Sequence, residues 1–279
     1  MKRMVILGGG ESGVGTALLA KQKGYDVFVS DKQKIKEKYK HVLIHNTIDW
    51  EEGTHTVAKI VNADIVMKSP GIPDTVPLVV SLKAKGIAVI SEIEFAAKYS
   101  NATLVGITGS NGKTTTTSWT HFILKNGGLQ ANLAGNIGMS FAAQVAEKPA
   151  ELFVLELSSF QLDGIVNFRP HIAVLTNITP DHLDRYDNSF EKYIESKFQI
   201  IKNQTEDDFF VYDADDATIT QWIKNNKVTS QQIPFSLSKE LEKGAFIKNE
   251  QLIIKLNANN IFTMPTKTLG LKGTLVARL

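Results

Sequence analysis

The sequence predicts an α/β fold in two parts, each built around a glycine-rich turn that joins a strand to a helix. In the first part the apolar run Met4–Leu7 leads into the glycines at 8 to 10 and then into a helix-like stretch. In the second part the run Thr103–Val105 leads into Gly106–Thr115 and another plausible helix. Strand and helix signals that alternate in this way are typical of parallel sheets covered by helices.

Composition supports two domains of ordinary size. The chain has 279 residues, of which 43% are hydrophobic and 22% charged, as expected for a globular protein. The helical stretch Glu92–Ala97 ends in Tyr99–Asn101, directly before the strand that leads into the second glycine turn. We therefore predict domains at residues 1–97 and 98–279.

Several classes of protein are disfavoured by composition. No run of about 18 apolar residues is present, so we expect no membrane span, and glycines end the apolar stretch of Met1–Gly8 too early for a signal peptide. The absence of cysteine excludes disulfides, thiolate metal sites and cysteine nucleophiles. A net charge of +2 favours no polyanionic partner, and we interpret the lysine-rich segment Lys32–Lys40 as a solvated face and not a nucleic-acid site. We expect a soluble, cytoplasmic monomer.

The first part begins with a βαβ unit. We predict strands at Met4–Leu7 and Asp26–Asp31 on either side of a helix at Val14–Lys23. Further strand signals follow, at Val42–Ile44, Ile65–Met67 and Ile87–Ile90.

The turn Gly8–Gly13 matches the pattern G-x-G-x-x-G, and Asp31 ends the second strand about 20 residues later, as in Rossmann-like dinucleotide sites. The pattern leaves the ligand open, because any diphosphate accepts a helix N-terminus and any ribose hydroxyl accepts a carboxylate. The loop Ser69–Pro73 follows a strand and is a second candidate for a diphosphate contact. A plain proline-glycine turn explains that loop equally well.

The second turn resembles a phosphate-binding loop. In such loops glycines let backbone N–H groups converge on an anion, and the new helix adds roughly half a positive charge at its N-terminus. Lys113 would reach the outer phosphates and Thr114 would ligate Mg²⁺. The strict motif has glycine six residues before the lysine, where this chain has Ile107. Glu156, directly after the apolar residues 152–155, is the best candidate for a carboxylate that holds Mg²⁺.

A polar loop and a helix follow. The strand His171–Thr176 runs into Asn177–Tyr186, where His182 is a candidate metal ligand or base. The predicted helix Phe190–Ile201 carries Lys197, to which the pattern alone assigns no role, because a helix lysine is normally a solvated charge. Beyond it we expect scaffold, with a strand at Asp208–Tyr212 and a hairpin around Lys248–Glu250 that ends at Leu252–Leu256.

Four motifs together resemble the Mur ligases in order and spacing. They are Gly109-Ser-Asn-Gly-Lys-Thr-Thr115, Gly135-Asn-Ile-Gly138, Leu155-Glu-Leu-Ser-Ser-Phe-Gln-Leu162 and Asp181-His-Leu-Asp-Arg-Tyr186. The third and fourth are most similar to the branch of the family that adds D-glutamate to UDP-N-acetylmuramoyl-L-alanine. The resemblance covers essentially the whole chain, and it explains Ile107, because the family's loop relies on Thr-Gly-x-Asn-Gly-Lys.

The resemblance implies an ATP-dependent amide ligase of peptidoglycan synthesis. Members phosphorylate a substrate carboxylate, and an amino acid then attacks the acyl phosphate. The residues that the resemblance assigns to ATP are Gly109, Ser110, Asn111, Gly112, Lys113, Thr114 and Thr115. Thr114 and Glu156 would bind a first Mg²⁺ and His182 a second, while Lys197 falls where the family carries a carbamylated lysine that supports Mg²⁺. Carbamylation needs the neutral amine, which costs an ordinary lysine roughly 4 to 5 kcal/mol at pH 7.

The resemblance also assigns the substrate site. Ser12, Gly13, Asp31 and Gly71 would bind the uridine diphosphate, and Asn136 and Ser158 would lie near the muramoyl part. Asp31 is followed by Lys32 and Gln33, whereas some members have a Thr-Arg pair there.

At the end of the chain, Leu269–Gly273 resembles the family's run toward a His-Asn pair that helps to hold adenine, but Thr274–Leu279 follows. We expect the family's third domain, which supplies the amino-acid site, to be absent from these residues. The 279 residues alone would then bind the UDP-linked substrate without forming the amide.

Three other functions remain open. A nicotinamide-dependent oxidoreductase would use the first glycine turn and leave the second unexplained. A P-loop kinase or nucleotide switch would give Asp181 and His182 different roles. A Mur ligase that adds another amino acid would share the phosphate loop.

Overall fold

The computed structural model describes residues 1–147 and 150–268, and the chain divides into two compact units. The first unit contains Met1–Ala102 and Gly128–Phe168, and the second contains Thr103–Gly127 and the chain from Arg169 onward. Each unit combines two separate stretches of sequence, so this division cannot be compared directly with a single boundary in the chain. The domain boundary after Ala97 therefore stays a prediction.

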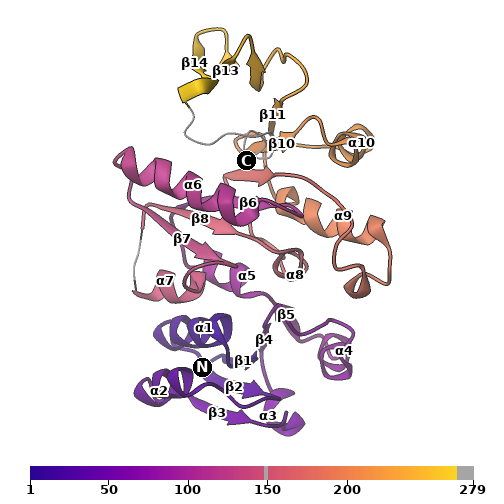
Figure 1. Ribbon diagram of the computed structural model, residues 1–279. Coiled ribbons are helices and arrows are strands. Elements are labelled where there is room, and N and C mark those ends of the chain that lie inside the picture. Colours follow the sequence, from indigo (N-terminus) through magenta and orange to yellow (C-terminus); the bar gives the residue numbers. More distant parts are fainter. Residues whose placement is uncertain (148–149, 269–279) are drawn as a thin grey trace. The chain divides into compact units, whose positions relative to one another are not determined.

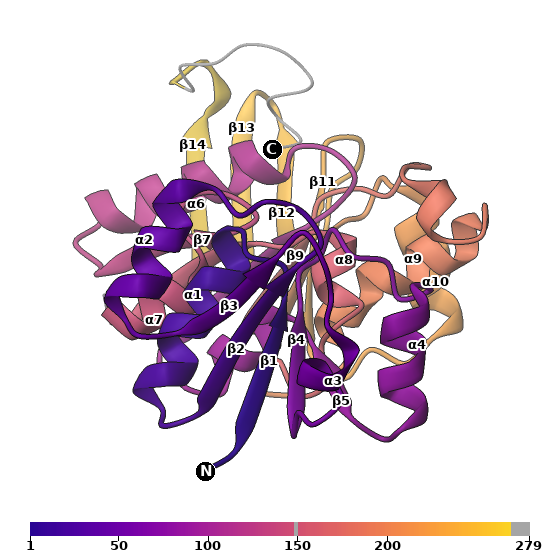
Figure 2. The same cartoon turned by 90° about the horizontal axis from the view of Figure 1, so that it is seen from below.

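The first unit contains a five-stranded parallel sheet in the order β3-β2-β1-β4-β5, which Figure 2 shows with β1 to β4 side by side. Its strands are β1 (Arg3–Leu7), β2 (Asp26–Asp31), β3 (Asp49–Glu52), β4 (Ile65–Lys68) and β5 (Ala88–Ile90). This is the strand order of the Rossmann fold. The fold class and four of the five predicted strands of this part are confirmed.

A helix follows each of these strands. These helices are α1 (Glu11–Gln22), α2 (Glu37–His45), α3 (Val57–Ile60), α4 (Pro77–Ala84) and α5 (Glu92–Ala97). Apolar residues of the strands and helices, among them Leu7, Phe28, Val66, Val79 and Leu82, form a buried core. This core fixes the strand ends from which the glycine turn, Asp31 and the loop after β4 emerge.

The predicted strand Val42–Ile44 is wrong, because these residues lie in α2. Only Leu43 is buried in that helix, and Ile44 is 64% exposed. The strand in this region is β3, which was missed because its sequence Asp-Trp-Glu-Glu is polar. An edge strand with a single neighbour, here β2, needs few apolar side chains.

The first unit also contains a pair of parallel strands, β7 (Ala131–Gly135) and β8 (Leu152–Glu156). Two helices accompany them, α7 (Phe141–Glu147) and α8 (Ser159–Leu162). Helix α7 packs against α1 and α5, and Figure 1 shows α7 beside both. The chain after β7 is thereby tied to the helix that follows the first glycine turn.

Within the second unit the sheet strands follow the order β14-β13-β12-β11-β10-β9-β6. Its strands are β6 (Thr103–Thr108), β9 (Ile172–Leu175), β10 (Phe209–Asp213), β11 (Gln231–Ser236), β12 (Gly244–Lys248), β13 (Gln251–Asn257) and β14 (Asn260–Pro265). Strands β6 to β12 are parallel, and the hairpin of β12 and β13 is antiparallel, as predicted. Its helices are α6 (Lys113–Asn126), α9 (Phe190–Phe198) and α10 (Ala217–Asn225), with short 3₁₀ turns at Leu183–Arg185, Gln199–Ile201 and Thr266–Thr268.

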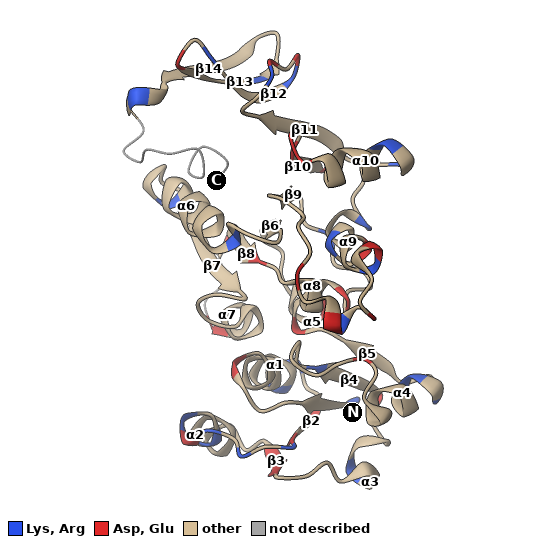
Figure 3. Ribbon diagram, turned by 45° about the vertical axis from the view of Figure 1, so that its right-hand side comes forward, with Lys and Arg blue, Asp and Glu red and all other residues tan. Residues whose placement is uncertain are grey.

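Charges of both signs lie along the lysine-rich segment and α2, as Figure 3 shows. Lys40 forms ion pairs with Glu37 at 3.0 Å and with Glu52 at 2.9 Å. Within the described residues no helix is both long and apolar enough to cross a membrane.

Candidate functional site

The phosphate loop joins β6 to α6, and two of its glycines have positive φ angles, +152° at Gly109 and +78° at Gly112. A Cβ atom at Gly109 would lie 2.0 Å from Oγ1 of Thr176, so no larger residue fits there. Ile107 lies inside β6 and is fully buried. The departure from the strict motif is therefore harmless, because the turn depends on the glycines at 109 and 112.

The loop that follows β9 holds the phosphate loop in place. The backbone N–H of Ser110 donates to the carbonyl of Asn177 at 2.9 Å, and the N–H of Asn111 donates to Oδ1 of Asn177, also at 2.9 Å. The Ser110 hydroxyl donates to the carbonyl of Thr179 at 2.8 Å. Sequence reasoning missed Asn177 and Thr179 as supports. Their position directly after a predicted strand was visible in the sequence, but the pairing of that strand with β6, which brings them to the loop, is set by the fold.

The N-terminus of α6 fits a bound phosphate. Its N-cap residue, Gly112, has no side chain that can cap the helix, and the first turn holds no acidic residue. Lys113 folds back over the loop, where its Nζ donates to the carbonyls of Gly109 at 2.9 Å and of Ser110 at 2.8 Å. Thr114 is exposed and Thr115 half-buried. Backbone N–H groups, a helix dipole and an ammonium group thus lie together at one loop.

We expect Gly109→Ala to lower the affinity for ATP at least tenfold and to destabilise the fold by about 2 kcal/mol or more, since it adds backbone strain and a clash with Thr176. Calorimetry and denaturant unfolding measure both effects. Gly24→Ala is the matched control, because Gly24 also has a positive φ, +77°, while its Cβ would meet no atom within 4 Å. The control should lose stability and keep ATP affinity. Equal ATP affinity in the two variants would contradict a phosphate-binding role for this loop.

Lys197 is buried, with 2% of its surface exposed, so the usual expectation of a solvated helix lysine is wrong here. Its Nζ donates to the carbonyl of Gly109 at 2.8 Å and to Oγ1 of Thr108 at 3.3 Å. The same atom lies 5.2 Å from the centre of the Tyr193 ring. The structure thus brings Lys197 and Lys113 to the same carbonyl, that of Gly109.

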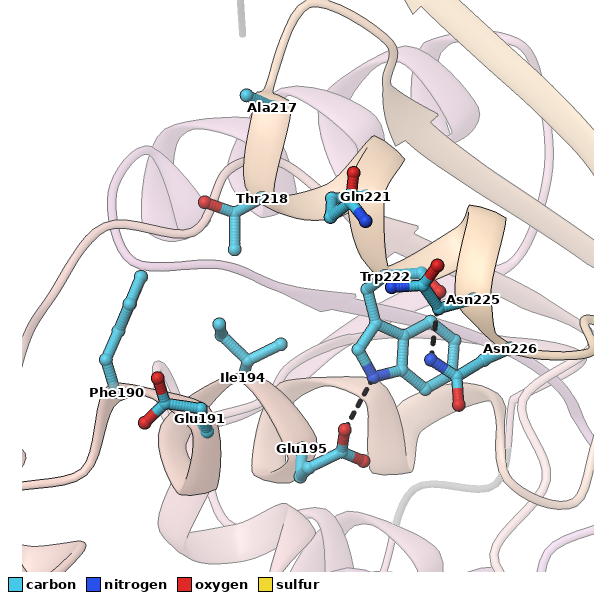
Figure 4. Close-up of a pocket in the computed structure, with 10 residues that line it drawn as sticks. All are labelled: Phe190, Glu191, Ile194, Glu195, Ala217, Thr218, Gln221, Trp222, Asn225 and Asn226. Carbon is cyan, nitrogen blue, oxygen red and sulfur yellow. Dashed lines mark hydrogen bonds between the residues drawn. The ribbon is translucent and has the colours of Figure 1, made fainter.

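The opposite face of α9 lines an open groove against α10. Figure 4 shows Phe190, Ile194 and Trp222 along this groove, with the indole N–H of Trp222 donating to Glu195 at 2.7 Å. None of the predicted site residues lines it. Lys197, the predicted site residue of α9, is buried and does not line this groove.

His182 lies in a strained part of the loop after β9. Its φ angle is +50°, its side chain is 55% exposed, and its Nε2 lies 3.5 Å from Oδ2 of Asp181. Among the described residues, no group of three or more His, Cys, Asp or Glu side chains is arranged to hold a metal ion. Metal binding by Thr114, Glu156, His182 and Lys197 stays a prediction.

In the first unit, the structure brings Asn136 and Glu156 together at the ends of β7 and β8. The Asn136 amide donates to Oε1 of Glu156 at 2.7 Å, and its backbone N–H donates to the Glu156 carbonyl at 2.8 Å. Glu156 is 1% exposed. Ser158 caps α8 and forms a capping box with Gln161. The predicted muramoyl contacts Asn136 and Ser158 thus flank a buried carboxylate.

The three candidate contacts for a diphosphate also lie together in the first unit. The N–H of Gly9 donates to Oδ2 of Asp31 at 2.7 Å. A Cβ atom at Gly8 would lie 2.4 Å from the hydroxyl of Ser69, and one at Gly13 would lie 1.8 Å from the Gly8 carbonyl. The glycine turn is therefore packed between Asp31 and the loop that contains Gly71, while Ser12 is half-buried at the start of α1.

A polar network beside Asp31 was not predicted. The Ser30 hydroxyl lies 2.8 Å from Oε1 of Glu51 and 2.7 Å from Nδ1 of His55. Burial lowers the pKa of His55, against the opposing effect of Asp31 and Glu51. An isolated histidine in a polar loop gives no sequence signal for such a network.

Comparison with known proteins decides the family. Residues 107–278 match the Mur ligase middle domain, and residues 3–76 match the MurD N-terminal domain. The chain belongs to the Mur ligase family. Its curated relatives include the UDP-N-acetylmuramoylalanine--D-glutamate ligases of Christiangramia forsetii, at 61% identity over 98% of this chain, and of Bacteroides thetaiotaomicron, at 52%. The ligase of that name from Salinibacter ruber is 36% identical. The chain spans about 61% of the length of the first two relatives.

Solved Mur ligases have the same fold. The UDP-N-acetylmuramate:L-alanyl-gamma-D-glutamyl-meso-diaminopimelate ligase from Neisseria meningitides is 20% identical with a TM-score of 0.64, and the match covers 100% of this chain and 90% of that one. The UDP-N-acetylmuramate-alanine ligase from Thermotoga maritima is 19% identical with a TM-score of 0.56, over 100% of this chain and 62% of that one. The predicted resemblance to the Mur ligases is confirmed. The Leu269–Gly273 run lies outside the described residues.

Proposed function

We propose that this Mur ligase chain belongs to an enzyme that adds D-glutamate to UDP-N-acetylmuramoyl-L-alanine with ATP. The observation that carries the proposal is the presence, in one chain, of a Rossmann-type glycine turn with Asp31 and of a phosphate loop closed by Lys113. The 61% identity to a relative named for this reaction supports the choice of amino acid. A cytoplasmic monomer is part of the proposal.

The proposed chemistry divides between two sites. In the first unit, the Gly8–Gly13 turn, Asp31 and Gly71 would hold the uridine diphosphate, while Asn136 and Ser158 would contact the muramoyl part. In the second unit, the loop from Gly109 to Thr115 would hold the ATP phosphates. Phosphoryl transfer to the substrate carboxylate chiefly needs positioning and charge neutralisation, which this chain's Lys113 and the N-terminus of α6 can supply.

Two Mg²⁺ ions are part of the proposal. Thr114 and Glu156 offer oxygen atoms, and His182 offers a ring nitrogen. The hydroxyl and the carboxylate fit the preference of Mg²⁺ for oxygen ligands. A carbamate on Lys197 would add a further anionic ligand, and the burial of that side chain supports this, because burial disfavours an ammonium ion. When bound, the ions would neutralise charge on the nucleotide phosphates.

Titration of the full-length protein with UDP-N-acetylmuramoyl-L-alanine and, separately, with NADH tests the proposal against the oxidoreductase alternative. We expect the UDP-linked substrate to saturate the protein and NADH to give no binding heat. Dependence of ATP consumption on D-glutamate would then separate a ligase from a kinase or a nucleotide switch. Saturation by NADH alone would overturn the proposed function.

A further inference from the structure

Glu92, at the start of α5, is a fully buried carboxyl group that joins α5 to α7. Its Oε1 accepts a hydrogen bond from the Ser140 hydroxyl at 2.6 Å and another from the N–H of Ala142 at 3.0 Å. The Ser140 hydroxyl in turn accepts a hydrogen bond from the N–H of Ala143 at 3.1 Å. Glu92 therefore fixes the point at which the chain enters α7.

Ser140 also packs tightly on α1. A Cβ atom at Gly15 would lie 1.9 Å from the Ser140 hydroxyl, so the two segments approach as closely as a glycine allows. The N–H of Ser140 lies 3.4 Å from Oε1 of Glu11, in the first turn of α1. One serine, held by Glu92, thus connects the helix that begins at the glycine turn with the segment that leads back to Asn136.

We propose that Glu92 is a positioning residue that sets the distance between the diphosphate contacts at Ser12 and Gly13 and the muramoyl contact at Asn136. The inference rests on the proposed function. Ser12 and Gly13 lie in the first turn of α1, and Asn136 lies four residues before Ser140. A substrate that spans both sites is bound well only when the two are held at a fixed separation.

The environment of Glu92 agrees with this role. Burial raises the pKa of its carboxyl, although the hydrogen bonds from Ser140 and from the backbone of Ala142 oppose that rise. The Ser12 hydroxyl lies near enough to lower the same pKa, yet no hydrogen bond within the described residues reaches the buried Oε2. Both hydrogen bonds from the α7 side therefore end on Oε1, the oxygen that fixes Ser140 and Ala142.

The test compares two ligands on the full-length protein. UDP uses only the diphosphate contacts, whereas UDP-N-acetylmuramoyl-L-alanine uses both sets. We expect Glu92→Ala to weaken binding of the whole substrate about tenfold, the equivalent of one hydrogen bond, and to change UDP binding less than twofold. In kinetics the KM for the UDP-linked substrate should rise while the KM for ATP stays unchanged. Glu92→Gln should restore both values, because its amide oxygen can still accept from Ser140 and Ala142.

Glu94 provides the matched control. It is a buried residue of the same helix. Its carboxylate accepts hydrogen bonds from the N–H groups of Val166 at 2.9 Å and Phe168 at 2.8 Å, and not from Ser140. Glu94→Ala should leave the ratio of the two affinities unchanged. If Glu92→Ala fails to fold, Ser140→Ala removes the hydrogen bond from the Ser140 hydroxyl and should weaken binding of the whole substrate relative to UDP in the same way.

The outcomes are distinct. Equal weakening of UDP and of the whole substrate in Glu92→Ala, or a folded Glu92→Gln that resembles Glu92→Ala, would overturn the positioning role. Failure of the wild-type protein to bind UDP would instead overturn the proposed function.

Discussion

In the full-length protein, Lys113→Ala should lower ATP-dependent turnover by on the order of 100- to 1,000-fold, the cost of removing one group that stabilises charge in a transition state. Binding of the UDP-linked substrate should stay within about twofold, because its predicted contacts lie in the first unit whereas Lys113 lies in the second. Turnover assays and calorimetry with each ligand measure the two effects. Equal loss of both ligands would show that one site binds both.

Lys125 is the control for this substitution. It lies in the last turn of the same helix, α6, and is exposed. Its removal deletes one positive charge near the C-terminus, which costs at most about 1 kcal/mol of stability. Lys125→Ala should therefore keep wild-type turnover. That result would show that the loss in Lys113→Ala comes from the position of Lys113 at the phosphate loop and not from the removal of a positive charge from α6.

The phosphate loop was predictable because its chemistry depends on local sequence. Backbone angles of +152° at Gly109 and +78° at Gly112 require glycine, and the lysine must follow directly at the helix start. The error at Val42–Ile44 has the opposite cause. A short apolar run is compatible with a strand or a helix. Here the run lies in α2, and the strand of this region is β3, a polar edge strand that no local pattern indicates.

The burial of Lys197 was overlooked, although the sequence held a signal for it. Tyr193 and Lys197 are four residues apart, and Ile200 and Ile201 continue the same stripe, so Lys197 stands at a position where a helix of this pattern carries a core residue. The supports at Asn177 and Thr179 and the Ser140–Glu92 contact could not be predicted in this way. They join segments that are far apart in the chain, at separations of 66 residues for Asn177 and 48 for Glu92.

Lys197→Ala should lower activity by on the order of 100-fold, the upper range for loss of a group that supports a bound metal ion. Two roles would explain such a loss. As a carbamate, Lys197 would supply a negative charge to Mg²⁺. As an ammonium group, it would anchor the phosphate loop through the carbonyl of Gly109, which its Nζ reaches at 2.8 Å. The two roles require opposite charges, so they respond differently to an added ligand.

Small carboxylates distinguish these roles. The substitution leaves space in a buried site, and acetate or formate at high concentration should enter it and restore part of the activity if the missing group is a carbamate. A carboxylate cannot donate a hydrogen bond to the Gly109 carbonyl, so it would not repair a lost loop anchor. Lys197→Arg should resist rescue in either case, because it leaves a cation in the same space.

Lys192 completes the experiment, because it lies on the exposed face of the same helix and pairs with Asp187 at 2.6 Å. An exposed ion pair of this kind contributes at most about 1 kcal/mol, so Lys192→Ala should retain wild-type activity and show no response to carboxylates. Wild-type activity in Lys197→Ala would show that Lys197 has only a structural role. A large loss that carboxylates leave unchanged, together with weaker ATP binding, would identify the loop anchor instead of the carbamate. Rescue confined to Lys197→Ala is the result that we expect, since Lys197 is buried beside the phosphate loop and its removal leaves space that a small carboxylate can enter.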